Sequence, residues 1–168
     1  MPTYQASSVI DAPFETVWGF YDDAAGLERL TPDWLGLREP TVIGPDGEPD
    51  PDTFRPGTTI SLELAPLGIS GLPGSSWVVE IVDREVEDER ASFVDEQVGD
   101  GGPFAAWRHV HRFVDLGDET LLVDRITYRL PTAGDLPLAT PALAALVWYR
   151  HRRTRKLLEA GRSQDVGP

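Results

Sequence analysis

The stretch FAAWRHVHRFV (residues 104–114) alternates between two kinds of side chain, which indicates a β-strand with one buried face. One side of the extended chain carries two histidines between large aromatic side chains: Trp107, His109, His111 and Phe113. The other side carries Arg108 and Arg112. Because arginine is mostly exposed in folded proteins, that side is expected to face water. Two of the three histidines in the chain are therefore predicted to point inward.

The segment ETLLVDRITYRL (residues 119–130) is expected to pair with this strand through a short turn at Gly117-Asp118. A two-residue turn pairs the apolar face of one strand with the apolar face of the other: Trp107 with Tyr128, His109 with Ile126, His111 with Asp124 and Phe113 with Leu122. A one-residue slip would instead bring Arg125 and Arg129 beside the histidines. The sequence therefore favours the two-residue register, in which Asp124 is the inward carboxylate of this hairpin.

Other segments predict the elements around this hairpin. Alternating patterns indicate further strands over residues 3–10, 57–65, 75–86 and 90–98. Two short helices are expected after the first strand, the first with an apolar stripe of Phe14, Val17, Trp18 and Tyr21 and the second over about 24–30. A long helix is expected from Thr140-Pro141 to about residue 160, with Gly161 as its end. Its predicted inner stripe consists of Leu143, Leu146, Val147, Arg150, Thr154, Leu157 and Leu158. The predicted fold class is α+β, with a curved antiparallel sheet of about six to seven strands wrapped around the long C-terminal helix.

Four segments resemble the START/SRPBCC superfamily, the helix-grip proteins of polyketide cyclase/dehydrase and lipid-transfer type. They are VIDAPFETVWGFYDD (9–23), FVDEQVGDGGPFAAWRHVHRF (93–113), DRITYRLP (124–131) and WYRHRRTRKLLEA (148–160). The resemblance covers nearly the whole chain, so one domain over residues 1–168 is expected. It is most similar to a subgroup of bacterial and archaeal proteins, some of which are fused to sugar-epimerase-like domains. The resemblance implies a hydrophobic pocket for a small molecule but no particular reaction, because the superfamily contains carriers, sensors and enzymes.

The composition excludes several classes of protein. A hydrophobic content of 40% indicates a globular chain, and no apolar run is long enough to span a bilayer. The absence of cysteine excludes disulfides and cysteine-ligated metal sites. The start of the chain, MPTYQASSVIDAP, lacks the basic and apolar regions of an export signal, so a cytoplasmic location is expected.

The charge of the chain is strongly acidic. The 28 acidic and 15 basic residues give a formal net charge of −13, which argues against nucleic acid as a partner. We interpret the acidic surface, with Lys156 as the single lysine, as an adaptation to high salt. Alternatively, a GC-rich genome would explain the near absence of lysine, and a cationic partner would explain the excess of acidic residues.

The candidate site residues lie on the predicted inner face of the sheet. Ligand contacts are expected from Trp77, Phe93, Trp107, His109, His111 and Tyr128. If the site is catalytic, the candidates are His111, Asp124 and His109, because a carboxylate that orients an imidazole supports a general base. We expect Asp124 to fix the tautomer of His111 and to leave His109 freer for a ligand. Structural pairing of a buried acid with a buried histidine is the alternative interpretation.

No cofactor or metal is predicted from the sequence. Two histidines at i and i+2 with one aspartate are metal-ligand types, but the sequence alone supplies no obvious further ligand. The predicted function is binding of a hydrophobic or aromatic small molecule, lipid-like or polyketide-like, between the sheet and the long helix. The alternatives are a cyclase or dehydratase that uses the pocket histidines and aspartate, and a protein-interaction module of chaperone-activator type. The identity of the ligand and the oligomeric state, monomer or dimer, stay open.

Overall fold

The computed structural model describes residues 1–32, 40–63 and 76–162, and these form seven strands and three helices. The strands are β1 (Thr3–Ile10), β2 (Thr41–Ile43), β3 (Thr59–Glu63), β4 (Ser76–Glu87), β5 (Arg90–Gln97), β6 (Ala106–Asp115) and β7 (Thr120–Arg129). The helices are α1 (Phe14–Tyr21), α2 (Ala24–Leu30) and α3 (Thr140–Arg162).

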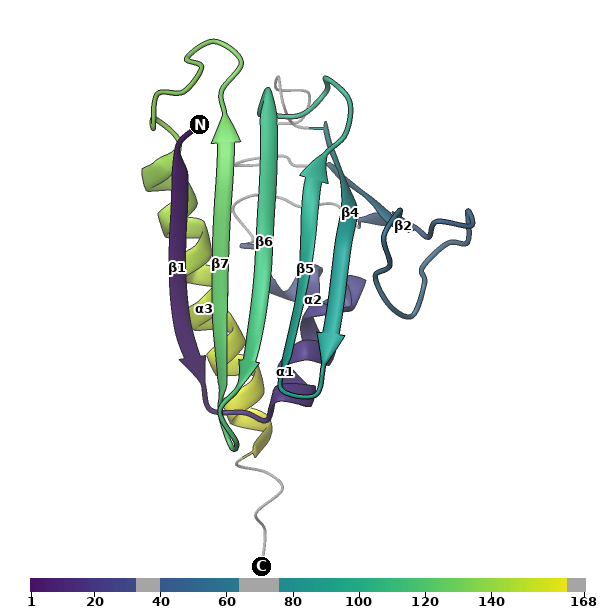
Figure 1. Cartoon of the computed structure of the whole chain (residues 1–168), viewed down its shortest axis with the longest axis vertical. Helices are drawn as coiled ribbons and strands as arrows, with labels where there is room; N and C mark the ends of the chain where they lie inside the picture. Colours follow the sequence, from purple (N-terminus) through teal and green to yellow (C-terminus); the bar gives the residue numbers. More distant parts are fainter. Residues whose placement is uncertain (33–39, 64–75, 163–168) are drawn as a thin grey trace, which may run out of the picture.

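All seven strands belong to one antiparallel sheet in the order β1-β7-β6-β5-β4-β3-β2. The three helices lie on one side of this sheet, and α3 runs behind β1 and β7 (Figure 1). A register shift between Ile81 and Asp83 interrupts the β4–β5 ladder, and such a bulge bends a strand. The structure thus confirms the predicted α+β helix-grip arrangement.

The register of the β6–β7 hairpin is the predicted one. His111 pairs with Asp124 and His109 pairs with Ile126. Gly117 has a φ of 91°, the left-handed conformation that primed two-residue hairpin turns require and that glycine adopts without strain. The alternation of burial along β6 follows from this register: the two histidines are buried, and the arginines immediately before and after them are exposed.

Some predicted boundaries differ from the observed ones. The short strand β2 was not expected, since three residues are too few to show an alternating pattern. Helix α3 continues through Gly161 to Arg162, past its predicted end. The outer ends of two predicted strands, residues 64–65 and residue 75, lie outside the described residues.

Helix α3 is tied to the rest of the molecule by apolar and polar contacts. Leu143 and Val147 are buried, as the apolar stripe predicts. The Tyr128 and Thr140 hydroxyls are 2.7 Å apart at the start of the helix, and the Tyr21 and Thr154 hydroxyls are 2.8 Å apart further along it. Among the described residues, no helix is both long enough and apolar enough to cross a membrane.

Candidate ligand cavity and its polar cluster

A cavity of about 260 Å³ lies on the helix side of the sheet. Its walls come from the inner faces of β3 to β7 and from all three helices. Five of the six predicted ligand residues lie in its wall: Trp77, Phe93, Trp107, His109 and His111. Tyr128 does not line it, because its side chain is fully buried and its hydroxyl contacts Thr140 at the start of α3. A ligand contact by any of these residues stays a prediction.

Aromatic side chains form one end of the cavity. The rings of Trp77 and Trp107 meet edge to face with centroids 4.9 Å apart, and Phe104 packs 4.8 Å from Trp107. The indole nitrogen of Trp77 is buried and has no hydrogen-bond partner among the residues that the structure describes. An unpaired buried donor is costly, so this N–H is a point where a bound molecule with an acceptor would gain stability.

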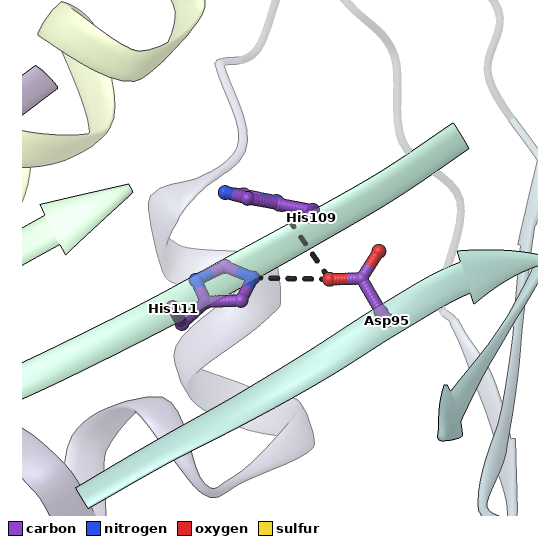
Figure 2. Close-up of side chains that lie close together, drawn as sticks. All are labelled: Asp95, His109 and His111. Atoms are coloured by element: carbon purple, nitrogen blue, oxygen red, sulfur yellow. Dashed lines mark hydrogen bonds and ion pairs between the residues drawn. The ribbon is translucent and has the colours of Figure 1, made fainter. Parts of the chain in front are cut away.

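Two closely packed imidazoles, with ring planes tilted by 40°, lie between two carboxylates in the wall of the cavity. The ring centroids of His109 and His111 are 3.7 Å apart. Asp124 Oδ1 lies on one side, 2.7 Å from His109 Nε2 and 3.0 Å from His111 Nδ1. Asp95 Oδ2 lies on the other side, 3.1 Å from His111 Nε2 and 3.7 Å from His109 Nδ1 (Figure 2). Each imidazole therefore has one nitrogen directed at Asp124 and the other directed at Asp95.

The roles predicted for the two histidines are wrong in part. Asp124 was expected to bond His111 and to leave His109 free, but its hydrogen bond is to His109. His111 Nδ1 is close to Asp124 but is not aligned for a hydrogen bond, and within the described part of the chain this buried nitrogen has no hydrogen-bond partner. The physical reason is that side chains on neighbouring strands also reach diagonally, to residues two positions from the directly paired one. Asp124 is the diagonal neighbour of His109.

Asp95 on β5 was missed as a site residue. It pairs across the sheet with His109 and is buried. Its Oδ1 accepts a hydrogen bond of 2.8 Å from the indole N–H of Trp107, and its Oδ2 faces the histidines. The signal was present in the sequence, because Asp95 follows Phe93 by two positions and so shares its face of the strand.

His151 on α3 was missed as well. Its Nε2 lies 2.5 Å from Asp124 Oδ2, and its Nδ1 lies 3.0 Å from the hydroxyl of Ser8 on β1. The predicted inner stripe of α3 contained Arg150, which lines the cavity but is only half-buried, whereas His151 is buried. Spacing supplies the signal, since His151 lies four residues after Val147 and eight after Leu143.

The electrostatics of the cluster shift four pKa values. Burial raises the pKa of Asp124, but its contacts with His109, His111 and His151 outweigh that effect and hold the pKa well below the usual value. Burial likewise raises the pKa of Asp95, and the two cavity histidines and Trp107 bring it below the usual value. Burial lowers the pKa of His109, and the neighbouring His111 lowers it further. For His111 burial also acts downward, but the two carboxylates outweigh it and the net pKa is raised. The cluster thus lowers the pKa values of both aspartates and of His109, and it raises the pKa of His111.

Comparisons with known proteins show the fold and no family beyond it. No model of a known protein family matches the chain, and a search of curated proteins finds no match. Among solved structures, a START superfamily protein from Mycobacterium smegmatis is similar, with 15% identity, a TM-score of 0.66 and coverage of 94% of this chain and 97% of that chain. A norcoclaurine synthase from Thalictrum flavum has 16% identity and a TM-score of 0.60, over 92% of this chain and 94% of that one.

A third similar structure is much longer than this chain. It is the nucleoside-diphosphate sugar epimerase from Corynebacterium glutamicum, with 25% identity and a TM-score of 0.64. The match covers 93% of this chain but 29% of the epimerase, so the chain spans less than a third of that protein. Together with the sheet order and the long C-terminal helix, these structures show that the chain has the helix-grip fold of the START/SRPBCC superfamily.

Proposed function

We propose that the protein binds a small aromatic or other hydrophobic molecule, lipid-like or polyketide-like, in the cavity between the sheet and α3. The observation that carries this proposal is an apolar cavity of about 260 Å³ with a few convergent polar groups in its wall. An apolar cavity of roughly 150 Å³ in another protein holds benzene, so the present one has room for a skeleton of about two aromatic rings.

The ends of the cavity suggest how such a molecule would lie. Trp77 and Trp107 offer aromatic surface for its rings, with the unpaired Trp77 N–H as a donor to an acceptor atom. His109, His111 and Asp95 offer polar atoms to a hydroxyl or carbonyl group. An elongated molecule with one polar end satisfies both regions.

The test combines discovery of the natural ligand with a defined probe. Native mass spectrometry of the protein purified from its own host is expected to show a co-purifying small molecule. With 2-naphthol as the probe, calorimetry is expected to give one site per chain. Leu146→Trp, which places a large ring in the cavity wall, is expected to abolish that site, whereas Leu138→Trp at an exposed position leaves it intact. Naphthol binding that is unchanged in Leu146→Trp would overturn the proposal.

A second candidate function is acid–base catalysis, which the hydrogen bond between Asp124 and His109 favours. This bond orients an imidazole in the cavity wall, the arrangement of a supported general base. The similar norcoclaurine synthase is an enzyme by its name. Conversion of the co-purified molecule by the wild type, and loss of conversion without loss of binding in His109→Gln, would support the enzyme over the carrier. A single domain, a cytoplasmic location and salt adaptation remain predictions of the sequence.

A further inference from the structure

We propose that Asp95, His109 and His111 form a binding site for one divalent transition-metal ion in the wall of the cavity. Asp124 acts in this site as the positioning residue behind both histidines. The inference goes beyond the proposed function and does not depend on it, because every group that carries it is a side chain of this cluster.

The three donor atoms already converge on one point. One ligand atom from each of Asp95, His109 and His111 lies within 4.8 Å of the other two. Two of the separations are 3.1 Å and 3.7 Å. Zinc binds nitrogen and oxygen ligands at about 2.1 Å, which places two ligands at a tetrahedral angle roughly 3.4 Å apart. The two separations that involve Asp95 are therefore within a few tenths of an ångström of this value.

The local structure explains why these atoms face the same point. His109 and His111 are two residues apart on β6, so both side chains project from the inner face of the sheet. Asp95 pairs directly with His109 from the neighbouring strand β5. All three residues are more than nine-tenths buried, and all three line the cavity.

The groups behind the three donors are those of a supported metal site. A metal-binding histidine usually donates its other ring N–H to a carboxylate, which fixes the tautomer and the ring orientation. Here Asp124 Oδ1 lies 2.7 Å from the second nitrogen of His109 and 3.0 Å from the second nitrogen of His111. The buried nitrogen of His111 that lacks a hydrogen bond is the one that faces Asp124. His151 in turn holds the other oxygen of Asp124.

Asp95 is prepared in the same way. The indole N–H of Trp107 occupies its Oδ1, which leaves Oδ2 directed at the two histidines. One carboxylate oxygen is thus held in place and the other is available as a ligand. Such a fixed first oxygen reduces the orientations that the aspartate loses when an ion binds.

The charge of the cluster also favours a divalent cation. Two aspartates lie against the two imidazoles, and a buried charge without compensation is costly. One divalent ion bound to two neutral imidazoles balances both carboxylates. The ion takes the place of any proton on His111 Nε2, and the proton of the neutral ring is then carried by Nδ1, which faces Asp124.

The ligand types select the class of metal. Imidazole nitrogens suit zinc, iron, copper and nickel, whereas magnesium and calcium prefer oxygen ligands alone. Two histidines and one carboxylate would leave further coordination positions vacant, and all three residues line the cavity. A cavity molecule with an oxygen donor atom would then bind the ion directly.

Zinc binding to untagged protein, freed of metal with a chelator, tests the proposal. All three histidines of the chain belong to the cluster and the chain has no cysteine, so a histidine-dependent signal reports on this site. Calorimetry is expected to give one Zn²⁺ per chain, and Co²⁺ is expected to give visible absorption bands from nitrogen and oxygen ligands. Asp95→Asn is expected to weaken Zn²⁺ binding by about 100-fold or more, and Asp124→Asn by about 10–100-fold.

The matched control is Asp22→Asn, which alters a buried aspartate away from the cavity histidines. It is expected to leave Zn²⁺ binding unchanged. His111→Gln serves as a second ligand variant if Asp95→Asn does not fold. Absence of stoichiometric zinc binding by the wild type, or equal binding by wild type, Asp95→Asn and His111→Gln, would overturn the proposal. The naphthol assay uses metal-free protein, so failure of the cavity proposal and failure of the metal proposal are separate results.

Discussion

The buried aspartates of this molecule lie in two places, and the residues that compensate their charge differ between the two. Asp22, at the end of α1, is 5% exposed and faces the guanidinium of Arg84 on β4. Arg84 Nη2 donates to Asp22 Oδ2 over 2.7 Å, and the backbone N–H of Phe54 donates to the other oxygen. The Arg84 side chain also lies over the ring of Trp18, 5.0 Å from its centroid. This acid has a permanently charged partner.

The cavity cluster instead satisfies Asp95 and Asp124 with groups that gain and lose protons. Their main polar partners are His109, His111 and His151. An arginine holds its charge at every relevant pH, so the Asp22 pair is fixed. Histidine changes charge near neutral pH and also binds metals. The comparison shows that burial of an aspartate does not by itself indicate a functional site. Partners that can change their charge and that line a cavity are a better indication.

The largest expected effect is the loss of stability in Asp124→Asn. This change removes the charge that three histidines share, and removal of one partner from a buried ion pair costs about 3 kcal/mol or more. Urea denaturation followed by circular dichroism measures the free energy of unfolding. Asp22→Asn is expected to cost less, about 1.5 kcal/mol, because the amide keeps an acceptor for Phe54 and Arg84 is near enough to water to be hydrated. A larger loss in Asp22→Asn would reverse the comparison.

The next largest expected effect is a dependence of the stability of the cavity cluster on pH. The pKa of Asp124 is lowered in the folded protein, so its contribution is present above its unfolded pKa of about 3.9 and is lost as pH falls through the folded value. The pKa of His111 is raised, so its contribution is present below about pH 6.5 and is lost as pH rises through the folded value. Unfolding of metal-free wild type and Asp124→Asn between pH 2 and 9 measures both limbs. The difference in the free energy of unfolding between the two proteins is expected to decrease toward both low and high pH. A difference that is constant over this pH range would contradict the roles assigned to Asp124 and His111.

A smaller loss of stability is expected for Trp107→Phe. The phenyl ring keeps most of the packing against Trp77 but removes the hydrogen bond to Asp95 Oδ1, a loss of about 1–2 kcal/mol. The pKa of Asp95 is expected to rise as well, because the indole N–H is one of the contacts that lower it. NMR titration of the carboxyl carbon of Asp95 measures this shift. An unchanged Asp95 pKa would show that the hydrogen bond does not hold this carboxylate.

The smallest expected effect is that of salt on the buried cluster. With a net charge of −13 the whole protein is expected to melt at a higher temperature in 2 M than in 0.1 M KCl, since screening reduces repulsion between surface carboxylates. The cluster is buried from solvent, so the stability difference between wild type and Asp124→Asn is expected to change by less than about 0.5 kcal/mol over this range. Thermal denaturation of both proteins across the salt series measures the two quantities. A melting temperature that is flat with salt would remove the interpretation of salt adaptation.

The fold could be predicted largely from the sequence because local patterns determine its elements. Alternation along residues 106–115 and 120–129, together with the Gly117-Asp118 turn, was enough to fix the register of the central hairpin. The aromatic stripe of α1 identified its buried face correctly. These are properties of single segments or of neighbours joined by a tight turn.

The polar cluster could be predicted only in part, because its members come from elements that are distant in the sequence. His109, His111 and Asp124 share one hairpin, and the sequence placed all three on its inner face. Asp95 and His151 reach them from β5 and α3, and their positions depend on sheet order and on the rotation of the helix. The bonding pattern also needed side-chain geometry, since a register assigns facing pairs but not the diagonal contacts that imidazole rings make.

The contact of Ser8, Asp124 and His151 has a consequence for how the chain acquires its structure. These residues stand near the start, in the last strand and in the last helix of the described chain. During synthesis on a ribosome, Asp124 emerges before His151, so β7 is exposed before α3. Before α3 docks, Asp124 on the sheet lacks its partner His151 and is exposed to water. Contacts between residues this far apart in sequence form late and slowly, so docking of the final helix is expected to be the event that closes the interior of the protein.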